Sequence, residues 1–241
     1  MAQVKREKLD ISLLESAFEN KLKWIKDVCS DGKFDELDTA NFDGTALRSA
    51  KAFAEMVRPK KEIAENCKSF MKSFPIGESY VNTVEEIDEE TNEKKLRVVN
   101  VGNGMITVGP IKTFGLCPHH LLPIEYTVYL CYIPKNGENS KVLGLSKLPR
   151  IAKEVSKFPM LQESYARNLA DILYEGNDWL EGINSAGSCV LVMGQHGCVL
   201  CRGVQEDCIT SCAEVRGCFA DDPRLEDKFY KQIENVRHCG L

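Results

Sequence analysis

The sequence predicts an α+β protein in which helices come first and strands and helices alternate afterwards. Apolar residues recur at helical spacing between Ile11 and Phe74, and short β-rich segments begin at Leu96. The later segments follow the order β-β-α-α-β-β, behind two or three N-terminal helices. A length of 241 residues, 43% of them hydrophobic, is enough for one large core with an appendage.

Residues 1–40 predict a helical appendage. Its apolar positions recur at helical spacing with charged residues between them, at Ile11, Leu14, Phe18, Leu22 and Ile25. We therefore expect an N-terminal helical appendage over 1–42 and a main domain over 43–241. Within the main domain, Asp43-Gly44-Thr45 predicts the start of a helix that runs to about Met56, and a further helical segment is expected over 63–74.

The β-rich part begins after a polar run over 85–95, which predicts a solvated loop or a hairpin tip. Strands over 96–101 and 105–108 flank Gly102-Asn103-Gly104, a sequence typical of a hairpin. A turn is expected at 134–137. Further strands are expected over 126–133, 141–145, 187–194, 198–205 and 213–219, and helices are expected directly after Ser146, over 161–174 and over 223–237.

Composition excludes several classes of function. The formal charge is -5 without a Lys/Arg tract, which argues against binding to a nucleic-acid backbone. No apolar run approaches the roughly 20 residues of a membrane span, and residues 1–8 lack the apolar core of a signal peptide. Eleven cysteines without a secretion signal predict reduced thiols, and we expect a cytoplasmic protein without membrane or nucleic-acid partners.

Three of the four histidines fall in two short segments that also contain cysteine, Cys117-Pro118-His119-His120 and 195–203. Thiolate and imidazole are the usual zinc ligands. Cys117 and His120 are three residues apart, so one tight turn can direct both at the same ion, and the fixed φ of Pro118 suits such a turn. The second segment predicts a strand that places His196, Cys198 and Arg202 on one face and Cys201 on the other.

This pattern favours a zinc site with Cys117, His120 and Cys198 as ligands, and with His119, His196 and Arg202 close by. Three protein ligands leave the fourth position for water, which is the pattern of a catalytic site. Cys198-x-x-Cys201 could instead belong to a closed four-cysteine site or to a redox pair. The second CxxC of a zinc ribbon is missing, and a thioredoxin-like CxxC would begin a helix rather than lie in a strand.

With these motifs the chain resembles the GTP cyclohydrolase I family. In chain order, the signature of that family is a Thr-Pro-x-Arg-Val-Ala-Lys helix, Cys-Glu-His-His, Gly-Leu-Ser-Lys-Leu-x-Arg, Gln-Glu and His-x-Cys-x-x-x-Arg-Gly. The similarity covers about residues 43–238. The matching segments occur in the family's order, at 45–51, 117–120, 144–150, 162–163 and 196–203.

The resemblance implies the tunnelling fold, in which an antiparallel sheet carries helices on one face. Subunits of that family pair their sheets into a ring-shaped homodecamer with active sites between subunits. The implied reaction opens the imidazole ring of GTP at C8, releases formate and recloses the product as 7,8-dihydroneopterin triphosphate. The implied cofactor is Zn²⁺, and residues 43–241 are the expected catalytic domain.

Residue by residue, the resemblance implies Cys117, His120 and Cys198 as metal ligands and His119, His196 and Ser146 as catalytic residues. The two histidines are the candidate acids that protonate N7 of the purine, because imidazole exchanges protons near pH 7. Ser146 matches the serine of the later sugar rearrangement, and Glu163 matches the acid that binds guanine. The implied substrate-binding residues are Lys51, Leu145, Lys147, Arg150, Gln162, Glu163 and Arg202, with the cations on phosphate.

The chain departs from the family pattern at four places. Pro118 replaces Glu, Ser164 replaces Arg, Gly197 stands where a larger residue is common, and 208–212 replaces a Thr-rich run. Two alternatives therefore stay open, a divergent paralogue acting on another purine nucleotide and a catalytically inactive nucleotide-binding homologue. Loss of metal would also allow Cys117 and Cys198 to form a disulfide.

Overall fold

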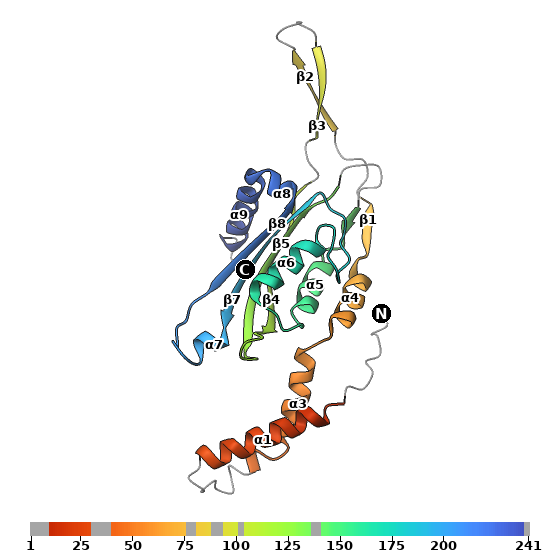
Figure 1. Cartoon of the computed structure of the whole chain (residues 1–241). Helices are drawn as coiled ribbons and strands as arrows, with labels where there is room; N and C mark the ends of the chain where they lie inside the picture. The colour runs from red at the N-terminus through yellow and green to blue at the C-terminus, as the bar shows by residue number, and fades with distance from the viewer. Residues whose placement is uncertain are drawn as a thin grey trace. The chain divides into compact units, whose positions relative to one another are not determined.

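The computed structural model forms two compact units that divide after Arg58, and it describes residues 10–29, 40–75, 81–87, 94–100, 104–135 and 141–238. Figure 1 shows their elements. The first unit contains α1 (Ser12–Cys29) and α3 (Thr45–Met56), which pack against each other. The rings of Phe18 and Phe53 meet edge to face, with centroids 6.4 Å apart. Both helices lie where the sequence predicts them, while the predicted domain boundary after residue 42 stays a prediction.

The second unit contains the predicted β-β-α-α-β-β core, formed by β4, β5, α5, α6, β7 and β8. Shorter elements precede, interrupt and follow this core. In chain order the elements are α4 (Lys60–Phe70), β1 (Ser73–Pro75), β2 (Val81–Ile87), β3 (Lys94–Asn100), β4 (Ile106–Leu116), β5 (Pro123–Ile133), β6 (Lys141–Leu143), α5 (Lys147–Val155), α6 (Gln162–Ile172), β7 (Gly187–His196), α7 (Gly197–Leu200), β8 (Thr210–Gly217), α8 (Cys218–Asp221) and α9 (Pro223–His238).

The main sheet is antiparallel, with strand order β4-β5-β7-β8, and the class is α+β as predicted. Side chains of β5 alternate between two buried faces. Val128 and Leu130 pack with the inner residues of α5 and α6, whereas Tyr129 and Cys131 pack with Phe229 of α9. Helices α5 and α6 therefore cover one face, as predicted, and α9 adds a layer on the other face (Figure 1).

Three local predictions are wrong. β3 pairs with β2 and not with β4, so the hairpin predicted around Gly102-Asn103-Gly104 is not the pairing that β3 makes, and residues 88–93 of the polar run lie outside the described residues. α4 ends at Phe70, because Ser73–Pro75 pairs with β6 instead of extending the helix. No strand follows β7 over 198–205, where the chain forms α7 and an irregular segment. The predicted loop residues 102–103 and 136–137 lie outside the described residues.

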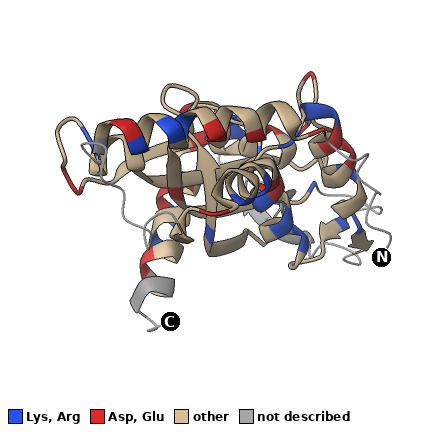
Figure 2. Ribbon diagram, turned by 90° about the horizontal axis from the view of Figure 1, so that it is seen from below, with Lys and Arg blue, Asp and Glu red and all other residues tan. Residues whose placement is uncertain are grey.

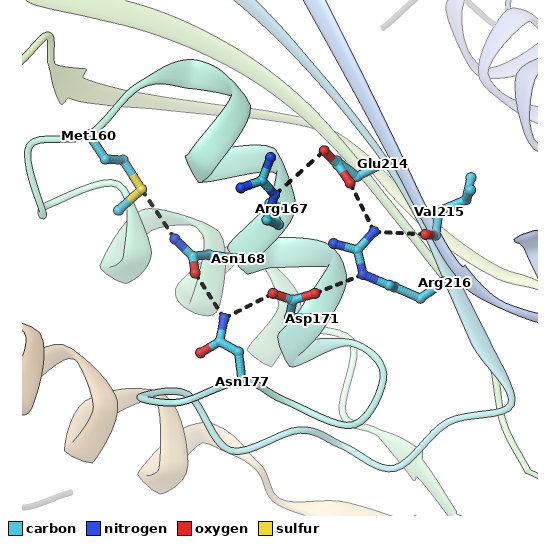
Figure 3. Close-up of polar contacts among 8 residues, drawn as sticks. All are labelled: Met160, Arg167, Asn168, Asp171, Asn177, Glu214, Val215 and Arg216. Carbon is cyan, nitrogen blue, oxygen red and sulfur yellow. Dashed lines mark hydrogen bonds and ion pairs between the residues drawn. The ribbon is translucent and has the colours of Figure 1, made fainter.

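A polar network fixes α6 to the edge strand β8 (Figure 3). Arg216 of β8 donates through Nε to Oδ1 of Asp171 and through Nη1 to Oε2 of Glu214, each at 2.8 Å. The other carboxylate oxygen of Asp171 accepts from Asn177 at 3.0 Å, and Arg167 of α6 approaches Glu214 at 4.0 Å. The network anchors α6, whose first two residues are predicted site residues.

Charged residues of both signs are interspersed along the helices (Figure 2). The formal charge of the whole sequence is -5. Among the described residues, no helix combines the length and the apolar character that crossing a membrane requires.

Candidate functional site

Two connections meet at one end of the main sheet. The register pairs Leu116 with Pro123 across β4 and β5, and Ile124 with His196 across β5 and β7. The connection over 117–122 and the residues after His196 therefore leave the sheet side by side. This is the end at which the sequence predicts the metal ligands.

The first connection is a tight turn with two internal hydrogen bonds. The backbone N–H of Cys117 donates to the carbonyl of Leu122 at 3.0 Å, and that of Leu121 donates to the carbonyl of Cys117 at 2.8 Å. Leu121 takes a left-handed conformation with φ 53°, which reverses the chain toward β5. Pro118 is exposed within the turn, in agreement with its predicted role there. The turn holds the Cys117 thiol beneath it, buried, and leaves His119 and His120 exposed.

The second segment is not the strand that the sequence predicts. β7 ends at His196, and Gly197 begins the four-residue helix α7 with Cys198 in its first turn. A Cβ at Gly197 would lie 2.8 Å from the carbonyl oxygen of Pro123, so only glycine lets α7 approach the first connection this closely. The pair Cys198-x-x-Cys201 thus lies at the start of a helix, as a thioredoxin-like pair would, so its position no longer argues against a redox function. Cys198, however, lies with Cys117 and His120, and Cys201 is outside that group.

The structure brings the three predicted ligands together. The candidate ligand atoms of Cys117, His120 and Cys198 all lie within 4.8 Å of one another. Two thiolates on one tetrahedral zinc ion are about 3.8 Å apart, given Zn–S bonds of about 2.3 Å, so small adjustments would close the site. Burial and the neighbouring Cys117 raise the pKa of Cys198, and a bound cation would offset both effects. This group can hold a metal ion.

Two further predicted residues contact the group directly. Nδ1 of His119 lies 3.7 Å from Sγ of Cys117. Nη1 of Arg202 lies 2.5 Å from Nε2 of His120. Because a guanidinium group only donates, this nitrogen of His120 accepts, and a metal ion bound through Nε2 would compete with Arg202 for the same lone pair. If the metal takes Nε2, Arg202 must turn away and its charge becomes available to an anion.

His196 and the start of α6 form the inner side of the site. Nε2 of His196 lies 2.8 Å from Oε1 of Gln162, which is buried at the first position of α6. Burial lowers the pKa of His196, and the carboxylate of Glu163 opposes this effect. Thr210, which the sequence analysis did not single out as a site residue, donates to the same Oε1 at 2.6 Å. The only feature of the sequence that pointed to Thr210 was its position in 208–212, the segment that replaces the family's Thr-rich run.

Four other predicted residues, Leu145, Ser146, Lys147 and Arg150, lie where β6 leads into α5. The backbone N–H of Leu143 donates to the hydroxyl of Tyr132 at 2.8 Å. Tyr132 is near the end of β5 opposite Pro123, nine positions along the strand, or about 30 Å. Ser146 follows Leu143 by three residues. Within one chain, Ser146 therefore begins α5 near the end of the sheet opposite the metal ligands, and α5 runs back along the sheet to Ser156, which contacts Thr113 of β4 at 3.0 Å.

Ser146 occupies the N-cap position of α5 as predicted, but its side chain makes no capping hydrogen bond. Leu145, Ser146 and Arg150 are exposed, and Lys147 is partly buried. Lys51 is exposed on α3 in the first unit. A separate pocket of about 410 Å³ runs along the outward side of α6 and contains Ser164, but none of the predicted site residues lines it.

Comparison with known proteins places these motifs in a family. The family model described as GTP cyclohydrolase I matches residues 71–234. The chain is 32% identical over 136 residues to GTP cyclohydrolase 1 of Campylobacter jejuni subsp. doylei, covering 56% of this chain and 66% of the relative. It is 35% identical over 134 residues to GTP cyclohydrolase 1 of Campylobacter curvus, covering 55% and 65%.

A third relative, GTP cyclohydrolase 1 of Clostridium perfringens strain 13, is 33% identical over 132 residues, with 54% of this chain and 66% of the relative covered. The chain thus spans slightly less than two thirds of the length of these relatives. A crystal structure of the archaeosine synthase QueF-Like in the apo form covers 46% of this chain and 91% of its own, at 13% identity and a TM-score of 0.31. This TM-score is too low to carry an argument.

Proposed function

The chain belongs to the GTP cyclohydrolase I family, and from that premise we propose that it is a zinc-dependent hydrolase acting on GTP. The proposed reaction opens the imidazole ring at C8, releases formate and forms 7,8-dihydroneopterin triphosphate. The observation that carries the proposal is the convergence of Cys117, His120 and Cys198 at one end of the sheet. Two sulfurs and one imidazole form a donor set that suits zinc and leaves one coordination position open.

Zinc would supply a nucleophile at neutral pH, because it lowers the pKa of water toward neutrality. The chain's own residues would handle the proton and the substrate. C8 of the purine becomes electrophilic when N7 is protonated, and we assign that proton to His119 or His196, which flank the ligand group. Glu163 lies close enough to His196 to act on its charge, and we assign it to the guanine edge.

The remaining assigned residues support a site shared between subunits. In one chain Ser146 begins α5 near the end of β5 opposite the metal ligands, because it follows Leu143, whose backbone contacts Tyr132. Residues at opposite ends of a strand can meet at one nucleotide when they come from different copies of the chain. We therefore propose a homo-oligomer, a homodecamer as in the family, in which Ser146, Leu145 and the phosphate-binding cations Lys147 and Arg150 face the metal group of a neighbouring subunit. Arg202 would complete the phosphate site, and Lys51 stays a further phosphate-binding cation that the resemblance implies.

Incubation of zinc-loaded protein with GTP tests the proposal, with formate and the fluorescence of the oxidised pterin as readouts. We expect both products from the unchanged chain and neither from Cys198→Ala. Cys208→Ala is the matched control, because Cys208 is exposed in the neighbouring segment and outside the ligand group. A zinc-loaded chain that releases no formate from GTP would reject the proposal.

The alternative enzymatic function is a reaction on another purine nucleotide, favoured by Pro118 in place of the family's Glu. Pro118 lacks both a carboxylate and a backbone N–H and is exposed next to His119. Formate from ATP or ITP but not from GTP would support this function. No formate from any purine nucleotide, with retained zinc, would indicate an inactive homologue.

A further inference from the structure

Gln162 uses all of its hydrogen-bonding capacity on protein groups. Its side chain is 3% exposed. Nε2 donates to the backbone carbonyls of Val192 at 3.0 Å and Thr210 at 3.3 Å. Oε1 accepts from the Thr210 hydroxyl at 2.6 Å and faces Nε2 of His196 at 2.8 Å. Since carbonyl groups only accept, the two backbone contacts determine which end of the amide is the nitrogen.

This arrangement determines where the proton of His196 resides. An amide oxygen opposite Nε2 requires a hydrogen on that nitrogen, so the neutral ring carries its proton on Nε2 and its lone pair on Nδ1. The other tautomer would direct a lone pair of His196 at a lone pair of Gln162. Flipping the amide would relieve that repulsion only by turning its oxygen toward two backbone carbonyls in a buried site.

Thr210 holds the amide oxygen in place, and Gly194 leaves the space that the amide occupies. With 2.6 Å between Oγ1 of Thr210 and Oε1 of Gln162, the hydroxyl hydrogen must lie between the two oxygens. The carbonyl of Gly194, at 3.0 Å, is the longer and competing acceptor. A Cβ at Gly194 would come within 2.5 Å of Oε1, so a larger residue there would displace the amide.

We propose that Gln162, held by Thr210, is a positioning residue that fixes His196 in the tautomer with its proton on Nε2, leaving Nδ1 to exchange protons with the substrate. The inference rests on the proposed catalytic role of His196. The bond from Nε2–H to Oε1 is the same before and after a proton reaches Nδ1, so the ring keeps its orientation during the transfer. Gln162 thus acts through His196 and not on the nucleotide itself.

The tautomer can be observed without any substrate. The protein has four histidines, so ¹⁵N-histidine labelling of the zinc-loaded chain gives a simple long-range ¹H–¹⁵N spectrum, which His196→Asn assigns. We expect His196 to carry its proton on Nε2 in the unchanged chain and in Thr210→Ser. Thr210→Val, which keeps the shape and removes the hydroxyl, should give a mixture. A wild-type His196 with its proton on Nδ1, or with mixed tautomers, would overturn the inference.

Kinetics separate positioning from general stability. Thr107→Val is the matched control, because Thr107 of β4 donates to Oε1 of Gln232 on α9 at 2.5 Å, a bond of the same kind on the other face of the sheet. We expect Thr210→Val to lower kcat for formate release at least about tenfold with KM and zinc content unchanged, and Thr210→Ser to recover it. Thr107→Val should lower only the melting temperature. Equal kcat losses in the two valine variants would refute a positioning role.

The two proposals fail in distinguishable ways. Absence of formate from every chain, with His196 protonated on Nε2, would reject the GTP reaction and leave the inferred tautomer standing. Full formate release from a chain with mixed His196 tautomers would reject the positioning role of Gln162 and leave the GTP reaction standing.

Discussion

The two ends of helix α6 contact polar regions that differ in how their groups are paired. Toward its C-terminal end, Asp171 and Glu214 both pair with Arg216 at 2.8 Å, and Arg167 supplies the second positive charge at 4.0 Å from Glu214 (Figure 3). Beyond its N-terminal end, two cysteines and a histidine converge within 4.8 Å of one another. The first region contains charges that cancel. The second contains electron-pair donors that could share one cation.

The difference separates a structural region from a functional one without reference to any relative. Opposite charges that meet at hydrogen-bonding distance are already satisfied, and they stabilise the fold without further partners. Several electron-pair donors that converge repel one another unless a cation or protons offset the repulsion. Substitutions in the polar network around Arg216 should therefore change the stability of the fold and nothing else. Substitutions in the ligand group should change stability only because they weaken metal binding.

Metal removal should have the largest effect. A ligand that binds only the folded chain stabilises it by about 4 kcal/mol when its concentration is a thousand times its Kd, which corresponds to a melting-temperature shift of roughly 10 °C. We expect a shift of this size between zinc-loaded and chelator-treated protein in calorimetry. Cys198→Ala should melt at the same temperature with and without chelator. A chelator-sensitive Cys198→Ala would place the metal elsewhere.

Arg216→Met should have the next largest effect, because it leaves Asp171 without a countercharge and Glu214 with Arg167 alone, at 4.0 Å. We expect about 2 kcal/mol of destabilisation in urea unfolding, less than for fully buried pairs because Asp171 is 16% and Glu214 24% exposed. Zinc content should not change. Arg224→Met removes an ion pair of the same 2.8 Å length from a side chain that is 89% exposed, and should have no measurable effect. Equal losses in both variants would show that burial does not distinguish them.

Gly197→Ala should weaken metal binding moderately. The added Cβ would lie 2.8 Å from the Pro123 carbonyl and would push α7, with Cys198, away from Cys117. We expect roughly tenfold weaker zinc binding in competition with a fluorescent chelator. Gly104→Ala, where an added Cβ meets nothing within 4 Å, is the control. Unchanged zinc affinity in Gly197→Ala would show that α7 can move without opening the site.

The smallest expected effect is a change in which thiols react. Exposed Cys201 and Cys208 should be alkylated at pH 8 in zinc-loaded protein, and chelation should add Cys198. Burial raises the pKa of Cys67 and of Cys131 to about 12, so both stay protonated and unreactive at that pH until the chain unfolds. Peptide mapping identifies the modified residues. Labelling of Cys198 at equal rates with and without zinc would argue against its role as a ligand.

The sequence predicted the elements whose patterns are local and strong. β5 is a continuous run of β-forming residues with both faces buried, and α6 combines helical spacing with an acidic first turn. The pairing of β3 was predicted wrongly because the Gly102-Asn103-Gly104 signal is local, while pairing with β2 depends on contacts that a local motif does not contain.

The three candidate ligands lie together as predicted, but for a partly different reason from the one that the sequence suggested. Alternation along a strand would place His196 and Cys198 on one face, but the chain turns into α7 between them. The grouping was predictable because few residue types bind zinc, and three of the four histidines lie beside cysteines. Thr210 was missed because a threonine hydroxyl has no distinctive spacing, and its role appears only once β8 lies next to α6.

The proposal that Ser146 and Cys117 of one site come from different subunits has a genetic consequence. If each site takes its metal from one subunit and Ser146 from the next, a chain that lacks Cys198 and a chain that lacks Ser146 are each inactive alone. Mixed into one assembly, they should rebuild some complete sites, because intact halves from the two variants can meet. Co-expression of the two variants should therefore restore part of the formate release that neither shows by itself, whereas mixing the separately assembled proteins should not.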